Sequence, residues 1–177
     1  MKITRTCLDG VLRLELECHC DDRGSFARFF CRNELLKFGV HFNIAQCNFS
    51  KNSRKGTVRG MHYQKPPYPE AKIVGCLGGR FYDVVVDIRK NSPTYLKWEA
   101  FELSSSNATL LYIPPYMAHG FQTLEDNTDV LYMLDAPFEA CAYTGVRYND
   151  PAFSIKWPLA KPSAIAKRDA EYPDFEP

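Results

Sequence analysis

Phe81-Tyr82-Asp83-Val84-Val85-Val86-Asp87-Ile88 has the clearest β-strand pattern in the sequence. Its β-branched and aromatic residues favour a β-strand, and apolar side chains fall on both faces of that strand. Such a strand is typical of the centre of a sheet that is packed on both sides. The stretch therefore predicts a protein built around a packed β-sheet.

Further short runs of similar composition lie on both sides of this stretch, and turn residues separate them, as in Gly78-Gly79, Asn91-Ser92-Pro93 and Glu125-Asp126-Asn127. Many short strands with regular turns predict an all-β antiparallel sandwich or barrel, although the strand topology does not follow from this pattern. The strand-like runs are Val11–Glu17, Phe42–Phe49, Ile73–Leu77, Arg80–Ile88, Tyr95–Leu103, Leu110–Ile113 and Val130–Met133.

Helix signals are few. Asn33–Phe38 precedes Gly39, which is a typical helix stop, and Ser163–Glu171 is a second candidate helix. A length of 177 residues is typical of one domain. We expect a single domain over residues 1–177, with the C-terminal segment from about 160 to 177 packed over the sheet.

The charge balance excludes one large class of function. The formal net charge is +1, whereas binding driven by nucleic-acid phosphates needs a clear basic excess. The seven cysteines are odd in number, and no apolar run approaches the ~20 residues of a membrane span. We therefore expect a cytoplasmic protein with reduced thiols that binds neither nucleic acid nor membrane.

Cys18-His19-Cys20 could belong to a metal site, but no second Cys/His pair lies at zinc-like spacing. The tripeptide is interpreted as a strand with small buried thiols, and no metal is expected.

Candidate chemistry is concentrated in Lys55-Gly56-Thr57-Val58-Arg59-Gly60-Met61-His62-Tyr63-Gln64. Arg59 is a permanent planar cation suited to phosphate oxygens, and His62 can act as a base near neutral pH. Lys72 follows as a second cation that could stabilise a developing oxyanion. Residues three apart on a regular strand face opposite sides, so a shared site for Arg59 and His62 needs a bulge, which Gly60 permits.

A second patch is Tyr112–Phe121, in which Pro114 and Pro115 precede His119 and Gly120. Two prolines followed by a histidine–glycine pair are typical of a rigid turn that places His119 at the start of a strand.

Together these motifs resemble the dTDP-4-dehydrorhamnose 3,5-epimerase family of nucleotide-sugar epimerases. The resemblance runs nearly end to end, and the ordered set is more specific than any one motif. Besides Arg59–Gln64 and Lys72 it includes Asp22–Phe26, Gln46–Ser50, Gly79–Arg89, Ser92-Pro93, Ile113-Pro114, Ala118–Phe121, Leu131-Tyr132, Asn149–Pro151, Trp157–Leu159 and Lys167–Ala170.

The resemblance implies a cupin-like antiparallel jelly roll with a few short helices, acting as a homodimer on a nucleoside-diphosphate 4-keto-6-deoxy sugar. It implies that His62 is the base, Asp169 orients it, Lys72 stabilises the enolate and Tyr132 returns a proton on the opposite face. The substrate-binding residues that it implies are Arg23, Phe26, Arg28, Gln46, Asn48, Arg59, His119 and Phe138. No cofactor is expected, and no Gly-x-Gly-x-x-Gly fingerprint is present.

Several positions depart from the family pattern. Arg28 stands where an acidic residue is usual near the nucleotide base, Met133 replaces a lysine, and Pro137-Phe138 replaces paired tyrosines. These changes indicate either an altered nucleotide or sugar specificity or neutral drift. The nucleotide (dTDP, CDP or GDP), the sugar and the number of inverted carbons stay open.

Three alternatives are less favoured. A metal-dependent cupin and a sugar-nucleotide ketoisomerase each generally carry a His-x-His pair, but position 64 is Gln64. A non-catalytic binding module would lack the base or its partner, and both His62 and Asp169 are present.

Overall fold

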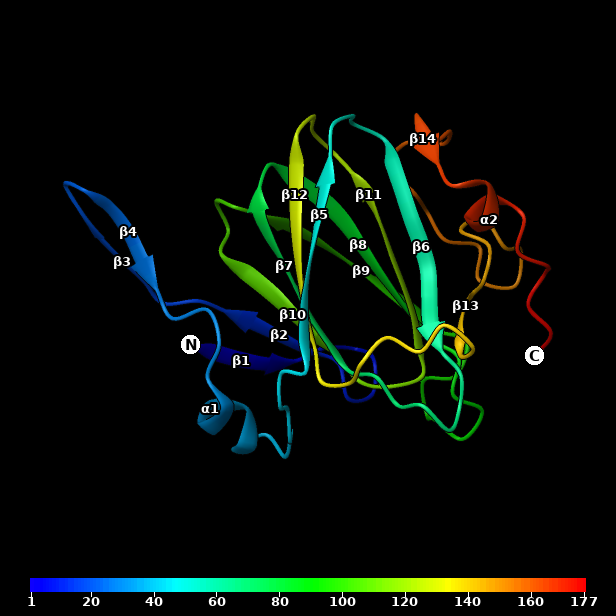
Figure 1. Ribbon diagram of the computed structural model, residues 1–177, viewed down its shortest axis with the longest axis horizontal. Helices are drawn as coiled ribbons and strands as arrows, with labels where there is room; N and C mark the ends of the chain where they lie inside the picture. Colours follow the sequence, from blue (N-terminus) through cyan, green and yellow to red (C-terminus); the bar gives the residue numbers. More distant parts are fainter.

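The predicted central strand is β8 (Arg80–Asp87), which lies between β11 (Met117–Thr123) and β9 (Trp98–Ser104). The computed structural model describes residues 1–177, and it consists of two facing sheets with short helices at the periphery (Figure 1). Nearly all strand pairs are antiparallel. The predicted all-β antiparallel fold with few short helices is therefore confirmed.

The two sheets have different strand orders. The first sheet has the order β1-β2-β10-β7-β12-β5, and the second has the order β13-β6-β11-β8-β9 with β14 parallel to β6. The first comprises Lys2–Arg5 (β1), Leu12–Glu15 (β2), Thr109–Ile113 (β10), Lys72–Gly78 (β7), Thr128–Leu134 (β12) and Gln46–Asn52 (β5). The remaining strands of the second are Tyr143–Gly145 (β13), Thr57–Gln64 (β6) and Ala164–Ile165 (β14).

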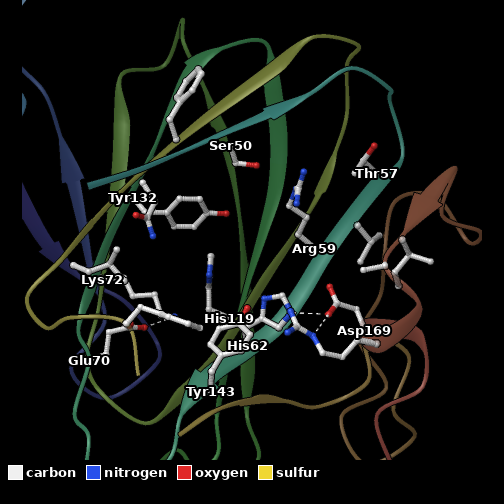
Figure 2. Close-up of a pocket in the computed structure, with 18 of the residues that line it drawn as sticks. Ser50, Thr57, Arg59, His62, Glu70, Lys72, His119, Tyr132, Tyr143 and Asp169 are labelled. Carbon is white, nitrogen blue, oxygen red and sulfur yellow. Dashed lines mark hydrogen bonds and ion pairs between the residues drawn. The ribbon is translucent and has the colours of Figure 1, made fainter. Parts of the chain in front are cut away.

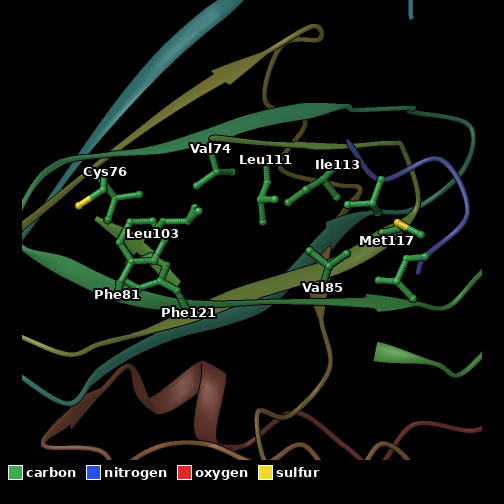
Figure 3. Close-up of a cluster of buried hydrophobic side chains, with 12 residues drawn as sticks. Val74, Cys76, Phe81, Val85, Leu103, Leu111, Ile113, Met117 and Phe121 are labelled. Carbon is green, nitrogen blue, oxygen red and sulfur yellow. The ribbon is translucent and has the colours of Figure 1, made fainter. Parts of the chain in front are cut away.

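The main apolar core fills the space between the sheets (Figure 3). Alternate residues of each strand point into it, so Phe81 and Val85 of β8 face Val74 of β7 and Leu111 of β10. The same alternation aims Asp83 into this space. The inward face of the strands is thus apolar over part of its length and polar elsewhere.

The outer faces of both sheets are covered as well. Leu35 of α1 (Arg32–Leu36) and Phe42 pack with outward residues of the first sheet such as Leu110. Val84 and Val86 of β8 pack under Phe153 and its C-terminal neighbours. This coverage explains why β8 is apolar on both faces.

Two glycines bring β6 and β11 unusually close together. A Cβ added at Gly60, whose φ is +125°, would lie 2.4 Å from the Gly120 Cα. The register of the two strands shifts between His119 and Phe121, which pairs with Arg59. The irregularity expected at Gly60 is therefore present, and His62 pairs directly with His119.

Some local predictions were wrong. Phe42–Ala45 is not a strand, because Phe42 packs as an irregular cover over the first sheet, and β5 begins only at Gln46. In Ser163–Glu171, only Lys167–Ala170 forms a helix (α2), since Ala164 and Ile165 pair with the start of β6. No helix is long and apolar enough to cross a membrane.

The tripeptide Cys18-His19-Cys20 does form a strand, but its thiols are exposed and not buried. It belongs to the hairpin of β3 (Cys18–Asp21) and β4 (Gly24–Ala27), which projects away from both sheets (Figure 1). A strand outside the sandwich has no core to bury its thiols against.

Candidate active site

A cavity of about 450 Å³ opens between the two sheets. Its lining is the polar continuation of the inward faces that form the core, because the alternation that buries Val74 and Val130 also turns Lys72 and Tyr132 inward. Side chains of both sheets and of α2 meet in it (Figure 2). Of the twelve predicted site residues, nine line this cavity: His62, Lys72, Tyr132, Asp169, Gln46, Asn48, Arg59, His119 and Phe138.

On the side of the second sheet, His62 and Asp169 form a hydrogen-bonded pair, with 2.8 Å between Nε2 and Oδ1 (Figure 2). The C-terminal segment brings Asp169 there because β14 pairs with β6 just before α2 begins. The Gly60 N–H donates to Oδ2 of Asp169 at 3.2 Å, and Arg168 Nε lies 3.6 Å from Oδ1. These contacts hold the carboxylate in one orientation.

The electrostatics of the pair favour a neutral imidazole. Burial lowers the pKa of His62, although the hydrogen bond to Asp169 opposes this. Burial by itself would raise the pKa of Asp169, but the hydrogen bond and charge of His62, the Gly60 N–H and Arg168 together outweigh it and leave that pKa below its usual value. A carboxylate only accepts hydrogen bonds, so Nε2 of His62 carries the proton and Nδ1 is left free to accept one.

A second imidazole–carboxylate pair lies deeper in the site. His119 Nε2 is 2.7 Å from Asp83 Oδ1, and both side chains are buried. Burial raises the pKa of Asp83, and the neighbouring His119 opposes this shift. The ring of Tyr132 stands edge-on to His119, with 6.2 Å between the ring centroids.

The first sheet provides a different set of groups. Lys72 Nζ lies 2.8 Å from Glu70 Oε1, and both side chains are nearly inaccessible, at 9% and 5% exposure. Tyr132 of β12 projects into the cavity from the same sheet (Figure 2). Burial raises the pKa of Tyr132, so its phenol stays protonated at neutral pH.

Polar contacts hold other lining residues in place. Arg59 Nε donates to Asn52 Oδ1 at 2.8 Å, and Gln46 Nε2 donates to Asn48 Oδ1 at 3.2 Å. Gln46 Oε1 accepts the N–H of Phe138 at 2.9 Å, which fixes the segment that follows β12.

The three predicted residues that lie elsewhere are Arg23, Phe26 and Arg28. Arg23 and Phe26 sit on the β3–β4 hairpin, and Phe26 is 73% exposed. Arg28 Nη1 is 2.9 Å from Glu34 Oε1 of α1. None of them lines the cavity of its own chain.

Sequence reasoning did not select four other residues as site residues. Asp83 could have been found in the sequence, because it is an aspartate at an inward position of an apolar strand. Glu70 could have been found with less certainty, since the alternate residues Glu70 and Lys72 share a face.

Nothing in the sequence pattern pointed to Tyr143 and Arg168. In the structure the Arg168 guanidinium lies 4.9 Å from the Tyr143 ring centroid, and the centroid of that ring lies 5.1 Å from that of His62.

This arrangement suits proton transfer to and from carbon. It combines an oriented base, a phenol with a firmly held proton and a buried cation that can stabilise an oxyanion. No group of three or more His, Cys, Asp or Glu side chains lies close enough together to hold a metal ion.

Comparison with known proteins yields one family. The sequence model of the family described as dTDP-4-dehydrorhamnose 3,5-epimerase matches residues 5–177. The dTDP-4-dehydrorhamnose 3,5-epimerase of Sinorhizobium fredii is 38% identical over 155 residues, which cover 88% of this chain and 80% of the relative.

Solved structures agree with this result. The dTDP-4-dehydrorhamnose 3,5-epimerase of Bacillus anthracis, with TDP and PPi bound, superposes with a TM-score of 0.95 at 36% identity, covering 98% of this chain and 99% of that one. A 3'-monoepimerase of Streptomyces bikiniensis, in complex with dTDP-quinovose, gives a TM-score of 0.89 at 29% identity, with coverages of 96% and 85%.

Proposed function

The chain belongs to the dTDP-4-dehydrorhamnose 3,5-epimerase family, and on this basis we propose how its own residues act as an isomerase. The substrate is a nucleoside-diphosphate 4-keto-6-deoxy sugar, and the reaction inverts carbons 3 and 5 in deoxysugar biosynthesis. The dTDP-linked sugar is our first candidate because the relatives are named for it.

The reaction begins at a carbon next to the ketone. Nδ1 of His62 removes the proton, the C–H electrons move into the ring, and the carbonyl oxygen becomes an enolate oxygen. Lys72 donates a hydrogen bond to that oxygen and balances its charge. Tyr132 then protonates the carbon from the opposite face, which inverts the centre; exchange with solvent returns His62 and Tyr132 to their resting protonation states.

The observation that carries this proposal is the position of the proposed base and acid on opposite sheets. His62 comes from β6 of the second sheet and Tyr132 from β12 of the first, with the cavity between them (Figure 2). A sugar ring held in this cavity has one face toward each group, as inversion requires. The contact between His62 and Asp169 supports the assignment of the base.

The remaining residues that line the cavity are proposed to bind different parts of the substrate. Arg59 and His119 are proposed to bind the diphosphate and the sugar, because they are the cationic or donor groups beside the base. Gln46, Asn48 and Phe138 lie along β5 and the segment after β12 and are proposed to contact the nucleotide end. No cofactor or metal is part of this mechanism, and metal analysis of active protein tests that statement.

A homodimer is proposed as the working form. The β3–β4 hairpin carries Arg23 and Phe26 away from the body of its own chain, where a second copy could receive them (Figure 1). Mixed dimers of a His62→Ala subunit and an Arg23→Ala/Phe26→Ala subunit should regain activity, since one of their two sites is intact. All seven cysteines are free, in keeping with the proposed cytoplasmic location.

A second candidate is an enzyme that inverts only one carbon, on a dTDP-, CDP- or GDP-linked sugar. The structural similarity to a 3'-monoepimerase supports it, as does Phe138, an aromatic residue without a hydroxyl at the cavity wall.

The test is incubation in deuterated water with 4-keto-6-deoxy sugars on dTDP, CDP and GDP, followed by NMR at carbons 3 and 5. Exchange with inversion at both carbons is expected. Inversion at one carbon would select the second candidate, and no exchange with any sugar would overturn the proposed function.

A further inference from the structure

We propose that Glu70 is a positioning residue that serves as the anionic partner of Lys72 and aims its ammonium at the enolate oxygen. This inference rests on the proposed function, because it assigns Glu70 a task through the role of Lys72. It adds a carboxylate that acts on the oxyanion side of the site, separate from Asp169, which acts on the base.

The geometry is that of a buried ion pair inside the cavity. Lys72 Nζ and Glu70 Oε1 are 2.8 Å apart, the two side chains are 9% and 5% exposed, and both line the cavity (Figure 2). An exposed pair at this distance would contribute little, because water screens it. A buried pair interacts strongly, and its partners depend on each other.

The backbone around Glu70 is fixed. The N–H of Ala71 donates to Asp135 Oδ1 at 2.7 Å, and the N–H of Asp135 donates to the Ala71 carbonyl at 3.3 Å. These bonds tie the segment before β7 to the end of β12. The carboxylate therefore occupies a set position and takes one of the three N–H groups of Lys72, which leaves the other two for a ligand.

Charge complements this geometry. An ammonium donates stronger hydrogen bonds to an oxyanion than an uncharged donor does, but a buried ammonium needs an anionic partner. Glu70 is that partner, and it holds the Lys72 ammonium where the enolate oxygen can accept from it.

The charge of Lys72 changes the pKa of other titratable groups near the pair. Burial lowers the pKa of His62, and the charge of Lys72 lowers it further. Burial raises the pKa of Asp83, which is paired with His119, and the charge of Lys72 opposes that shift. Tyr132 projects into the same cavity from β12, the strand that pairs with β7.

Glu70 has neighbours of its own on other segments. Burial raises the pKa of Asp135 and of Tyr143, and the negative charge of Glu70 adds to both shifts.

The decisive variant is Glu70→Gln, which keeps the shape and an accepting oxygen but removes the charge. The Lys72 ammonium then loses its anionic partner and is no longer aimed at the enolate oxygen, so kcat should fall by about tenfold or more. A loss of kcat at nearly constant KM is the expected signature, because the contact that is weakened is made in the transition state.

Two further variants separate this role from packing. Glu70→Asp keeps the charge and should restore kcat toward its wild-type value. In a Lys72→Met background, Glu70→Gln should not lower kcat further, because its effect passes through Lys72. An unchanged kcat in Glu70→Gln would overturn the proposal, as would a further loss of kcat in the Lys72→Met background.

The position of Lys72 can also be followed without turnover. In protein with ¹³C-labelled lysine, with the Lys72 signal assigned by its loss in Lys72→Met, the NMR order parameter of the Lys72 side chain should be lower in Glu70→Gln than in wild type. An unchanged order parameter would overturn the inference even if the enzyme acts on a different sugar. A wild-type protein that exchanges no substrate proton would instead overturn the proposed function and leave this measurement valid.

Discussion

The two sheets supply different chemistry to one cavity. The second sheet brings His62, Arg59 and His119, and both imidazoles are bonded to carboxylates, Asp169 and Asp83. The first sheet brings Lys72, bonded to Glu70, and Tyr132. In the proposed reaction the second sheet removes a proton, whereas the first stabilises the oxyanion and returns a proton.

Groups on two facing sheets can invert a carbon centre between them. Base and acid on the same strand face would lie on one side of a bound sugar and would return the proton to the side it left. Placing them on facing sheets separates the two proton transfers in space. If this is correct, loss of the base His62 on the second sheet should stop exchange, whereas loss of the acid Tyr132 on the first sheet should leave exchange and stop inversion.

The largest effect is expected for His62→Ala. Without the base, solvent exchange at both carbons should fall by about 10²–10⁴, while the affinity for the nucleoside diphosphate is retained. NMR in deuterated water measures the exchange and calorimetry measures binding.

His41→Ala is the matched control for this variant, because His41 is exposed and lies outside the cavity. It should behave as wild type. Near-wild-type turnover by His62→Ala would show that the second sheet does not supply the base.

Tyr132→Phe tests the first sheet. Inversion should fall by about 10² or more, because the proton donor is lost, whereas exchange at the acidic carbons should continue through His62. The ratio of deuterium incorporation to inverted product measures the split between the two steps. Unchanged inversion would exclude Tyr132 as the acid, and equal losses of exchange and inversion would contradict the division between the sheets.

The sandwich and most of its cavity could be predicted because they follow from local alternation. Strands that bury Val74 and Phe81 on one face also turn Lys72 and Asp83 inward, so the pattern of β7 and β8 contains the site. The glycine at position 60 indicated the irregularity that lets Arg59 and His62 share the cavity.

Other parts of the site could not be predicted from local pattern. Asp169 reaches His62 because β14 pairs in parallel with β6, a contact that nothing in Ser163–Glu171 signals. Only the family resemblance connected these two residues. The exposure of Cys18 and Cys20 was also missed, because alternation does not indicate whether a strand belongs to a sheet with a core.

Asp169→Asn should have a moderate effect, and it tests how the carboxylate on α2 supports the base on the second sheet. The amide can still accept from Nε2 of His62, but it cannot balance an imidazolium charge, so kcat should fall by about tenfold to 10²-fold. The carboxylate raises the pKa of His62 against the larger effect of burial. Its loss lowers that pKa, so the acid limb of the kcat/KM profile should move to lower pH; an acid limb that moves to higher pH would contradict this account.

The smallest effect is expected outside both sheets, at Arg28→Glu. Arg28 is largely exposed and pairs with Glu34, and such a pair contributes about 1 kcal/mol or less, so the fold should tolerate the change. If Arg28 meets the nucleotide base of a partner's site, the reversed charge should raise the affinity for a thymidine nucleotide relative to cytidine and guanosine nucleotides by about tenfold or less. Calorimetric titration with the three nucleoside diphosphates measures this preference.

Glu34→Gln is the matched control, because it breaks the same ion pair without placing a new charge at position 28. A shift in base preference in Arg28→Glu but not in Glu34→Gln would add the segment after the β3–β4 hairpin to the two sheets as a third contributor to the site. Equal preferences in wild type and both variants would assign Arg28 to the surface, and specificity would then depend on residues of the sandwich, with Gln46, Asn48 and Phe138 as the next positions to exchange.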